Sequence, residues 1–229
     1  DISSWLYYLT KHIKLATPDT VFISTNYDIL VDNALSMQII NNGGNIGDIN
    51  YGLDFVNQDE LNQGIISNND MKLFKLHGSL NWLYCATCNT LQLTPFEKSF
   101  SHHVTTCPNC QSFYSPIIVP PTFFKDMSNV FISTVWNKTE NILRNVTKII
   151  FCGYSFPDAD MHIKYMLKRI ELNRGNQPLS ITVINHHKGK SNEAMSLEEN
   201  RYQRFFKCDV NYKKVSFEEF SENPQRFFT

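Results

Sequence analysis

Apolar side chains recur every three or four residues in several stretches of the chain. Leu6, Leu9 and Ile13 follow this spacing near the start, and Met166 and Ile170 follow it later. Such a spacing places the apolar side chains on one face of a helix. The predicted helices are 3–15, 28–40, 126–147, 158–174 and 197–207, with a further short helix at the end of the chain.

Shorter apolar runs lie between the predicted helices and end in Gly, Pro or small polar residues, which is typical of buried strands. Residues 41–64 are rich in Asn, Gly and Asp, which indicates a long surface loop with a short strand or turn in it. Strands that alternate with helices predict an open α/β fold, with a parallel sheet covered on both faces. The predicted strands are 21–25, 72–78, 117–121, 148–156 and 180–185, with an edge strand at 211–217.

Polar residues stand at the predicted carboxyl ends of several strands. In open parallel sheets, ligands bind beyond these ends, so the residues there are candidate binding or catalytic groups. The candidates are Thr25-Asn26-Tyr27-Asp28, His77-Gly78-Ser79, Gly153-Tyr154-Ser155-Phe156 and Asn185.

Length and charge narrow the classes of function. The 229 residues suit one large domain or one domain with a small insert, and we favour the insert. The 21 Lys and Arg residues balance 22 Asp and Glu residues, which gives no general reason to expect nucleic-acid or membrane-surface binding. Because no apolar run of about 18 residues and no signal peptide is recognisable, we expect a cytoplasmic protein. Its oligomeric state stays open.

Four of the six cysteines form two Cys-x-x-Cys pairs, Cys85 with Cys88 and Cys107 with Cys110. This spacing is typical of zinc held by four thiolates. Four protein ligands leave no open coordination position, so we expect a structural metal rather than a catalytic one. A nucleic-acid-binding ribbon is the functional alternative, but basic residues are scarce around the pairs.

Two histidines and two further cysteines complete the set of candidate metal ligands. His102 and His103 lie between the pairs and could compete, although the four cysteines make them unnecessary. Cys152 and Cys208 lie outside the pairs, and we expect both to be reduced, buried thiols.

Five motifs follow one another in a fixed order along roughly residues 20–186. They are a Thr-Asn-x-Asp turn, a His-Gly pair, the cysteine pairs, a Gly-x-Ser strand end and a strand ending Ile-Asn. This series resembles the sirtuins. HGSLNW at 77–82 and GYSFPDAD at 153–160 look more like the sirtuin-like domains of prokaryotic defence proteins than like the protein deacylases.

The resemblance implies a sirtuin-like NAD-binding domain over 1–229, with a Rossmann-like open parallel sheet and a small inserted zinc-ribbon module at 82–116. The Gly-Ala-Gly-x-Ser loop that holds the pyrophosphate in this family would precede residue 1, so we expect the N-terminal strand and this loop to be missing. The Pro-Asp-Val-Val-Phe-Gly-Glu element of the deacylases is replaced by Ser-Pro-Ile-Ile-Val-Pro-Pro at 115–121, which weakens a deacylase interpretation.

The resemblance also implies roles for single residues. His77 would be the base, Asn26 would hold the ribose or orient the attacking water, and Asp28 would accept a hydrogen bond from the nicotinamide carboxamide. Ser155 would contact phosphate, and Asn185 would contact the adenine ribose. The expected NAD-binding set is Thr25, Asn26, Asp28, Gly153, Ser155 and Asn185.

Each of these residues also has a structural interpretation. Asn26 and Asp28 suit the cap of the helix that follows them. A histidine before glycine at a strand end is often structural. Gly153 would permit tight backbone packing, and Asn185 would be a turn residue.

We therefore expect an enzyme with NAD as its substrate and zinc as a structural metal. The leading hypothesis is an NAD glycohydrolase that releases nicotinamide and ADP-ribose in antiphage defence, together with further domains or partner proteins. The alternatives are an NAD-dependent protein deacylase and a non-catalytic module that binds NAD or ADP-ribose or acts as a scaffold.

Overall fold

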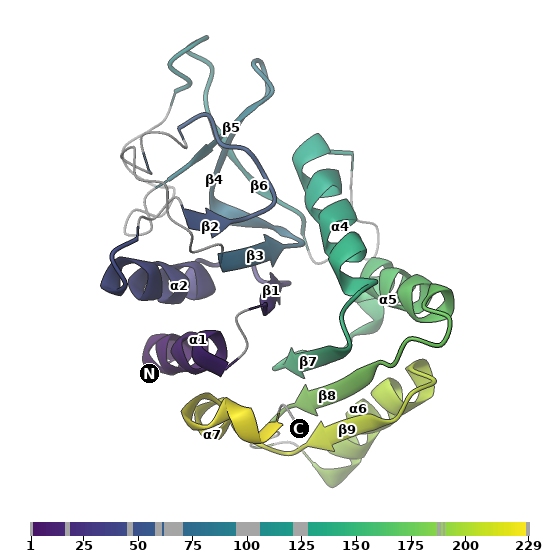
Figure 1. Cartoon of the computed structure of the whole chain (residues 1–229). Helices are drawn as coiled ribbons and strands as arrows, with labels where there is room; N and C mark the ends of the chain where they lie inside the picture. The colour runs from purple at the N-terminus through teal and green to yellow at the C-terminus, as the bar shows by residue number, and fades with distance from the viewer. Residues whose placement is uncertain are drawn as a thin grey trace. The chain divides into compact units, whose positions relative to one another are not determined.

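The chain divides into two units, which are described one at a time (Figure 1). The first unit holds residues 1–120 and 125–138, and the second holds 121–124 and 139–229. No helix among the described residues is long and apolar enough to cross a membrane. The computed structural model describes residues 2–16, 19–44, 48–57, 61, 71–94, 106–120, 128–186, 189 and 191–227.

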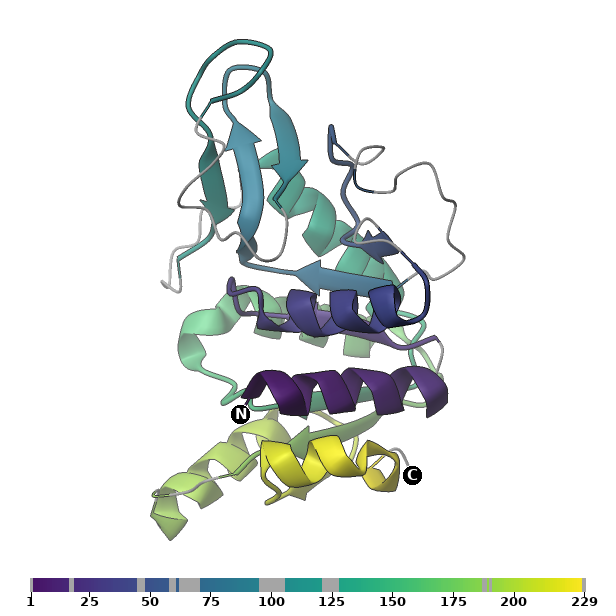
Figure 2. The same cartoon turned by 90° about the vertical axis from the view of Figure 1, so that its left-hand side faces the viewer.

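The first unit begins with a helix pair over a small parallel sheet. Its strands run parallel in the order β1-β3-β2. Helices α1 and α2 lie side by side in Figures 1 and 2, and Gln38 of α2 donates a hydrogen bond of 3.2 Å to the Tyr7 carbonyl of α1. The elements are α1 (Ile2–Ala16), β1 (Val21–Ser24), α2 (Leu30–Asn41), β2 (Ile49–Asn50) and β3 (Met71–Lys75).

An antiparallel sheet follows directly and extends away from the helix pair (Figure 2). It consists of β4 (Gly78–Cys85), β5 (Thr90–Leu93) and β6 (Ser115–Ile118), in the order β5-β4-β6. The apolar run at 72–78 was predicted to be one strand, but β3 ends at Lys75 and the chain turns at 76–77. The strand predicted at 117–121 corresponds to β6, which pairs antiparallel with β4 instead of joining a parallel sheet.

Residues 51–57 follow β2 in the chain and pack against this antiparallel sheet. The Asn57 side chain donates to the Leu93 carbonyl at 2.8 Å and accepts from the Leu93 N–H at 3.0 Å. The rings of Tyr51 and Phe55 contact Trp82 of β4, with centroid distances of 5.7 and 6.3 Å. Trp82 is fully buried, so β4 forms the centre of a local core.

The second unit has a parallel sheet in the order β7-β8-β9. Helix α4 leads into it, and the expected edge strand is β9. Helix α6 begins five residues before the predicted 197, because the Ser191 hydroxyl caps it by accepting from the Ala194 N–H at 3.2 Å. The elements are the end of α4 (Val130–Leu143), whose residues 130–138 belong to the first unit, and then β7 (Lys148–Cys152), η2 (Asp158–Asp160), α5 (Met161–Asn173), β8 (Ser180–Ile184), α6 (Asn192–Phe205), β9 (Val210–Lys213), α7 (Phe217–Glu222) and η3 (Pro224–Phe227).

Aromatic rings form the core at the end of strand β7. Phe156 is 1% exposed and stacks on Tyr202 with a centroid distance of 4.7 Å. Phe151 and Phe206 lie within 6.1 Å of Phe156. Cys152, the last residue of β7, is exposed, so the prediction that it is buried was wrong. Cys208 is only half-buried.

We expect the turn between β3 and β4 to tolerate no side chain at Gly78. This residue has φ +77°, and a Cβ there would lie 1.9 Å from the Ile117 carbonyl oxygen. Gly78→Ala should therefore lower the free energy of unfolding in urea by at least about 2 kcal/mol. Gly43→Ala is the matched control, because φ is +79° but no atom lies within 4 Å, and it should cost only about 1 kcal/mol. Equal losses would mean that the close approach to Ile117 does not matter.

Candidate functional site

Two turns meet at the carboxyl edge of the β1-β3-β2 sheet. One turn follows β1 at 24–28, and the other joins β3 to β4. Four main-chain carbonyls of the first turn each accept a hydrogen bond from the second segment, which fixes the two turns to each other. The pairs are Leu76 N–H to Ser24 at 2.9 Å, His77 Nδ1–H to Thr25 at 2.8 Å, Leu80 N–H to Tyr27 at 2.9 Å, and Lys75 Nζ–H to Asp28.

The contact with Thr25 determines which nitrogen of His77 is basic. A carbonyl oxygen only accepts, so Nδ1 must carry the hydrogen in this bond. In the neutral ring, Nε2 then has the lone pair that can take a proton. The His77 side chain is 4% exposed, and its own carbonyl accepts from the Val119 N–H at 2.9 Å. The ring is therefore held in one tautomer by the fold.

Asn26 and Asp28 occupy the turn in different ways. The Asn26 residue is exposed, and its main-chain N–H donates to the Ser24 hydroxyl at 3.1 Å. The Asp28 carboxylate accepts from the Leu30 N–H at 3.1 Å, at the start of helix α2. Asp28 thus contacts the first residue of the helix, but the N-cap position is Ile29 and no side chain caps α2, so neither Asn26 nor Asp28 is the predicted cap.

The four cysteines of the two pairs come together in the first unit. Their sulfur atoms all lie within 4.8 Å of one another, so the cluster could hold a metal ion. Cys85 and Cys107 are fully buried, and Leu83 and Tyr114 pack against them. His102 and His103, the predicted competitors, lie outside the described residues.

Each cysteine pair ends in the same backbone conformation. Asn89 follows Cys88 with φ +50°, and Gln111 follows Cys110 with φ +61°. Such left-handed residues are uncommon outside glycine, and they turn the chain sharply back after each pair. The two halves of the cluster are thus alike in backbone as well as in sequence.

The remaining candidates lie in the second unit, at the carboxyl edge of the β7-β8-β9 sheet. Gly153 has φ +65° with open space around its Cα, so the alternative of tight packing does not explain it. Asn185 donates its side-chain N–H to the buried carboxylate of Glu198, which also accepts from the Tyr212 hydroxyl at 2.9 Å. Ser155 is half-buried. The structure thus gathers the two groups of candidates at two sheet edges, one in each unit.

Comparison with known proteins identifies the family. The family model described as SIR2-like domain matches residues 20–206. The chain belongs to the SIR2-like family. No curated protein matches the sequence.

Solved structures show the same fold. A Sir2 homologue mutant in complex with ADP-ribose matches with a TM-score of 0.52 and 15% identity, over 97% of this chain and 65% of that one. A Sir2 homologue in complex with NAD matches with a TM-score of 0.51 and 15% identity, over 97% of this chain and 63% of that one. The SIR2-like chain therefore spans less than two thirds of the length of these relatives. The predicted sirtuin-like α/β fold is confirmed.

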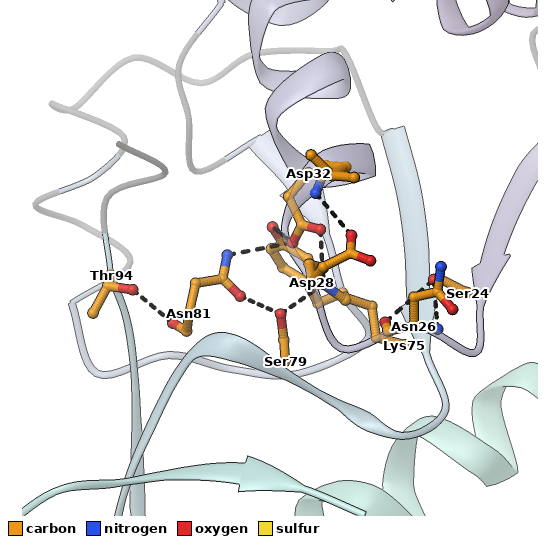
Figure 3. Close-up of polar contacts among 10 residues, drawn as sticks. Ser24, Asn26, Asp28, Asp32, Lys75, Ser79, Asn81 and Thr94 are labelled. Carbon is orange, nitrogen blue, oxygen red and sulfur yellow. Dashed lines mark hydrogen bonds and ion pairs between the residues drawn. The ribbon is translucent and has the colours of Figure 1, made fainter. Parts of the chain in front are cut away.

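The SIR2-like domain also contains a buried polar network that the sequence did not reveal (Figure 3). Lys75 Nζ lies 2.8 Å from Asp32 Oδ2 and 2.7 Å from Ser79 Oγ. Asp32 also accepts from the Tyr51 hydroxyl at 2.8 Å and from the Asn81 side chain at 3.3 Å. All five side chains are within 1% of full burial. The only local signal was an isolated lysine within the apolar run LFKL.

Burial and the Asp32 charge act in opposite directions on the pKa of Lys75 and in the same direction on the pKa of Tyr51. Burial lowers the pKa of the Lys75 ammonium, and the neighbouring Asp32 carboxylate opposes that shift. Burial and the same carboxylate both raise the pKa of Tyr51 well above its usual range, so its hydroxyl stays a donor. Loss of one partner of such a buried ion pair strongly destabilises the folded protein, because the other charge is left buried without a partner.

We expect the contact of Asp28 with the Leu30 N–H to be separable from any chemical role. Asp28→Ala removes the acceptor for the Leu30 N–H and should lower the free energy of unfolding by about 1 kcal/mol. Asp28→Asn keeps an acceptor oxygen and should cost only a few tenths of that value. Urea titrations of both variants would measure the difference. An equal loss in both would show that the charge of Asp28, and not its hydrogen bond, stabilises the helix start.

Proposed function

We propose that this SIR2-like domain binds NAD and hydrolyses the bond between nicotinamide and ribose. The observation that carries the proposal is the fixed tautomer of His77, whose basic Nε2 belongs to the turn pair that also presents Asn26. The structural relatives crystallised with NAD and with ADP-ribose agree with it. In this proposal the domain works within a larger defence protein, whose other parts or partners control when NAD is consumed.

The chemistry needs a weak base rather than a strong nucleophile. The C1′–N bond breaks with its electron pair going to the pyridinium nitrogen, through a transition state with oxocarbenium character. A water oxygen then bonds to C1′, and the water's proton passes to His77 Nε2 and on to solvent. The products are nicotinamide, ADP-ribose and a proton, so the step needs no further reactant.

The other candidates keep the roles that the family resemblance implies for them. We assign Asn26 to the ribose or the attacking water, and Asp28 to the nicotinamide carboxamide, whose N–H groups need an acceptor. Thr25 contributes by fixing the imidazole through its carbonyl. Gly153 and Ser155 would contact the phosphates. Because Glu198 engages the N–H of Asn185, the amide oxygen of Asn185 is the atom we assign to the adenine ribose.

Release of nicotinamide by the full-length protein tests this proposal. His77→Ala should lower the rate by about 100- to 10,000-fold, the usual contribution of a general base, and Asn26→Ala should also abolish release. His12→Ala, on helix α1, is the matched control and should leave the rate unchanged. Chromatography of the products would separate nicotinamide, ADP-ribose and any acylated product.

Three other outcomes would each contradict a part of this proposal. NAD consumption only in the presence of an acyl-lysine peptide would identify a protein deacylase. Calorimetric binding of NAD or ADP-ribose without turnover would identify a binding module. Full activity of His77→Ala would remove His77 as the base even if NAD is hydrolysed.

We also propose that the cysteine cluster holds one structural zinc ion. Cys85, Cys88, Cys107 and Cys110 supply four sulfur donors, the set that zinc prefers in closed sites. Bound zinc would supply crosslinking between β4 and the turn at 107–110, and it would leave no coordination position for a substrate. The cluster therefore supports the fold of the first unit and not the chemistry.

Metal analysis tests this second proposal. The purified protein should contain about one zinc per chain, and removal by a chelator should lower the melting temperature by at least about 5 °C. Cys107→Ser should have the same effect, because it removes a buried ligand. Cys152→Ser is the control and should retain the metal. Less than half an equivalent of zinc, or an unchanged melting temperature after chelation, would contradict a structural site.

A further inference from the structure

The ammonium group of Lys75 makes three hydrogen bonds, one for each of its N–H groups. It donates to Asp32 Oδ2 at 2.8 Å, to Ser79 Oγ at 2.7 Å and to the main-chain carbonyl of Asp28. Both charged side chains of the pair are 0% exposed. The ammonium group therefore has a full set of partners, and its position is determined by all three.

The three acceptors belong to different parts of the first unit. Asp32 lies on helix α2, and Ser79 lies on strand β4. The Asp28 carbonyl belongs to the turn that presents Asn26, two residues earlier. Figure 3 shows Lys75 between these groups, with Asn26 and Asp28 on the same turn. Helix α2 and strand β4 thus hold the Lys75 ammonium in place. The ammonium fixes the turn at 24–28 through the Asp28 carbonyl.

The same segment also presents the proposed base. Lys75 is the last residue of β3, and His77 follows it by two positions. His77 contacts the Thr25 carbonyl at 2.8 Å, so Lys75 and His77 fix the two ends of one short turn. A shift of the Asp28 carbonyl would therefore move Asn26 relative to the imidazole.

A Ser-Lys nucleophile is the competing chemical explanation, and the hydrogen bonds oppose it. Such a pair requires an uncharged lysine that accepts the serine proton. Here Lys75 donates to Ser79, and the Ser79 hydroxyl donates to Asn81 Oδ1.

A purely stabilising role is the other explanation. Buried ion pairs are often no more stabilising than apolar residues of similar size, because removing two charges from water is costly. Stability alone therefore does not account for a lysine at this place. A rigid, directional contact with a main-chain carbonyl does, because an apolar side chain could not make it.

We propose that Lys75, held by Asp32 and Ser79, is a positioning residue that fixes the Asp28 carbonyl and thereby places Asn26 against His77. The inference rests on the proposed cleavage of NAD. Lys75 itself touches no reacting atom, and its effect passes through the turn at 24–28.

The decisive variant removes both charges of the pair. Lys75→Met alone would leave the Asp32 carboxylate buried and unpaired, and the protein could simply fail to fold. The double variant Lys75→Met with Asp32→Asn avoids this, because the asparagine oxygen still accepts from Tyr51 and Asn81. Its melting temperature should lie close to that of the unmodified protein.

The full-length double variant should lose turnover without losing substrate binding. We expect kcat for nicotinamide release to fall by about 100-fold, the usual cost of a misplaced catalytic group, and KM for NAD to change little. Asn57→Ala is the control, because it removes two buried hydrogen bonds to Leu93 in the same unit but should leave kcat unchanged. A double variant with unchanged kcat would reduce Lys75 to a structural residue.

Hydrogen exchange separates this inference from the proposed function. In the double variant, amides of residues 24–30 should exchange about tenfold faster, whereas those of residues 35–40 in helix α2 should not change. If the unmodified protein releases no nicotinamide, the proposed function fails, and the exchange data still decide whether Lys75 holds the turn. Unchanged exchange at 24–30 would overturn the positioning role, whatever happens to kcat.

Discussion

The hydrogen bonds between the turn at 24–28 and the segment at 75–80 are the contacts on which the candidate site depends. Carbonyls at the end of a parallel strand have lost their strand partners, and buried carbonyls without partners are costly. Here Leu76, Leu80, His77 and Lys75 supply the missing donors. The same bonds that complete the backbone at this edge also set the tautomer of His77 and the place of Asn26. The backbone of this edge and the candidate side chains are thus held by one set of contacts.

The cores of the two units are built from different kinds of side chain. In the second unit, rings such as Phe156 and Tyr202 stack closely, and apolar contact needs little directional precision. In the first unit, Lys75, Asp32 and Asn81 are as deeply buried as any apolar residue. Such a network costs desolvation, but it allows only one arrangement of its donors and acceptors. Buried side chains are therefore positioned most strictly in the first unit, which contains His77 and the cysteine cluster.

Much of this could be predicted from the sequence, because apolar runs and their polar ends carry a direct signal. The strands at 21–24, 148–152 and 180–184 and the cysteine cluster follow from such patterns. The strand predicted at 72–78 extends too far, since β3 ends at Lys75 and the chain turns at 76–77. Only Gly78, with its left-handed backbone, marks the change of direction. The Lys75 network was missed because its members lie up to 49 positions apart, as Asp32 and Asn81 do, and each one alone suits an exposed surface.

The close approach of Gly78 to Ile117 has a consequence for how related sequences should be read. His77 is the proposed base, but the following residue has the stricter steric requirement, since it must do without a side chain. In an alignment, a histidine at this place without its glycine would belong to a different backbone path, and its imidazole would meet other neighbours. Related sequences should therefore be compared at His77 and Gly78 together. A change of fold at this edge would be visible first at the glycine and not at the histidine.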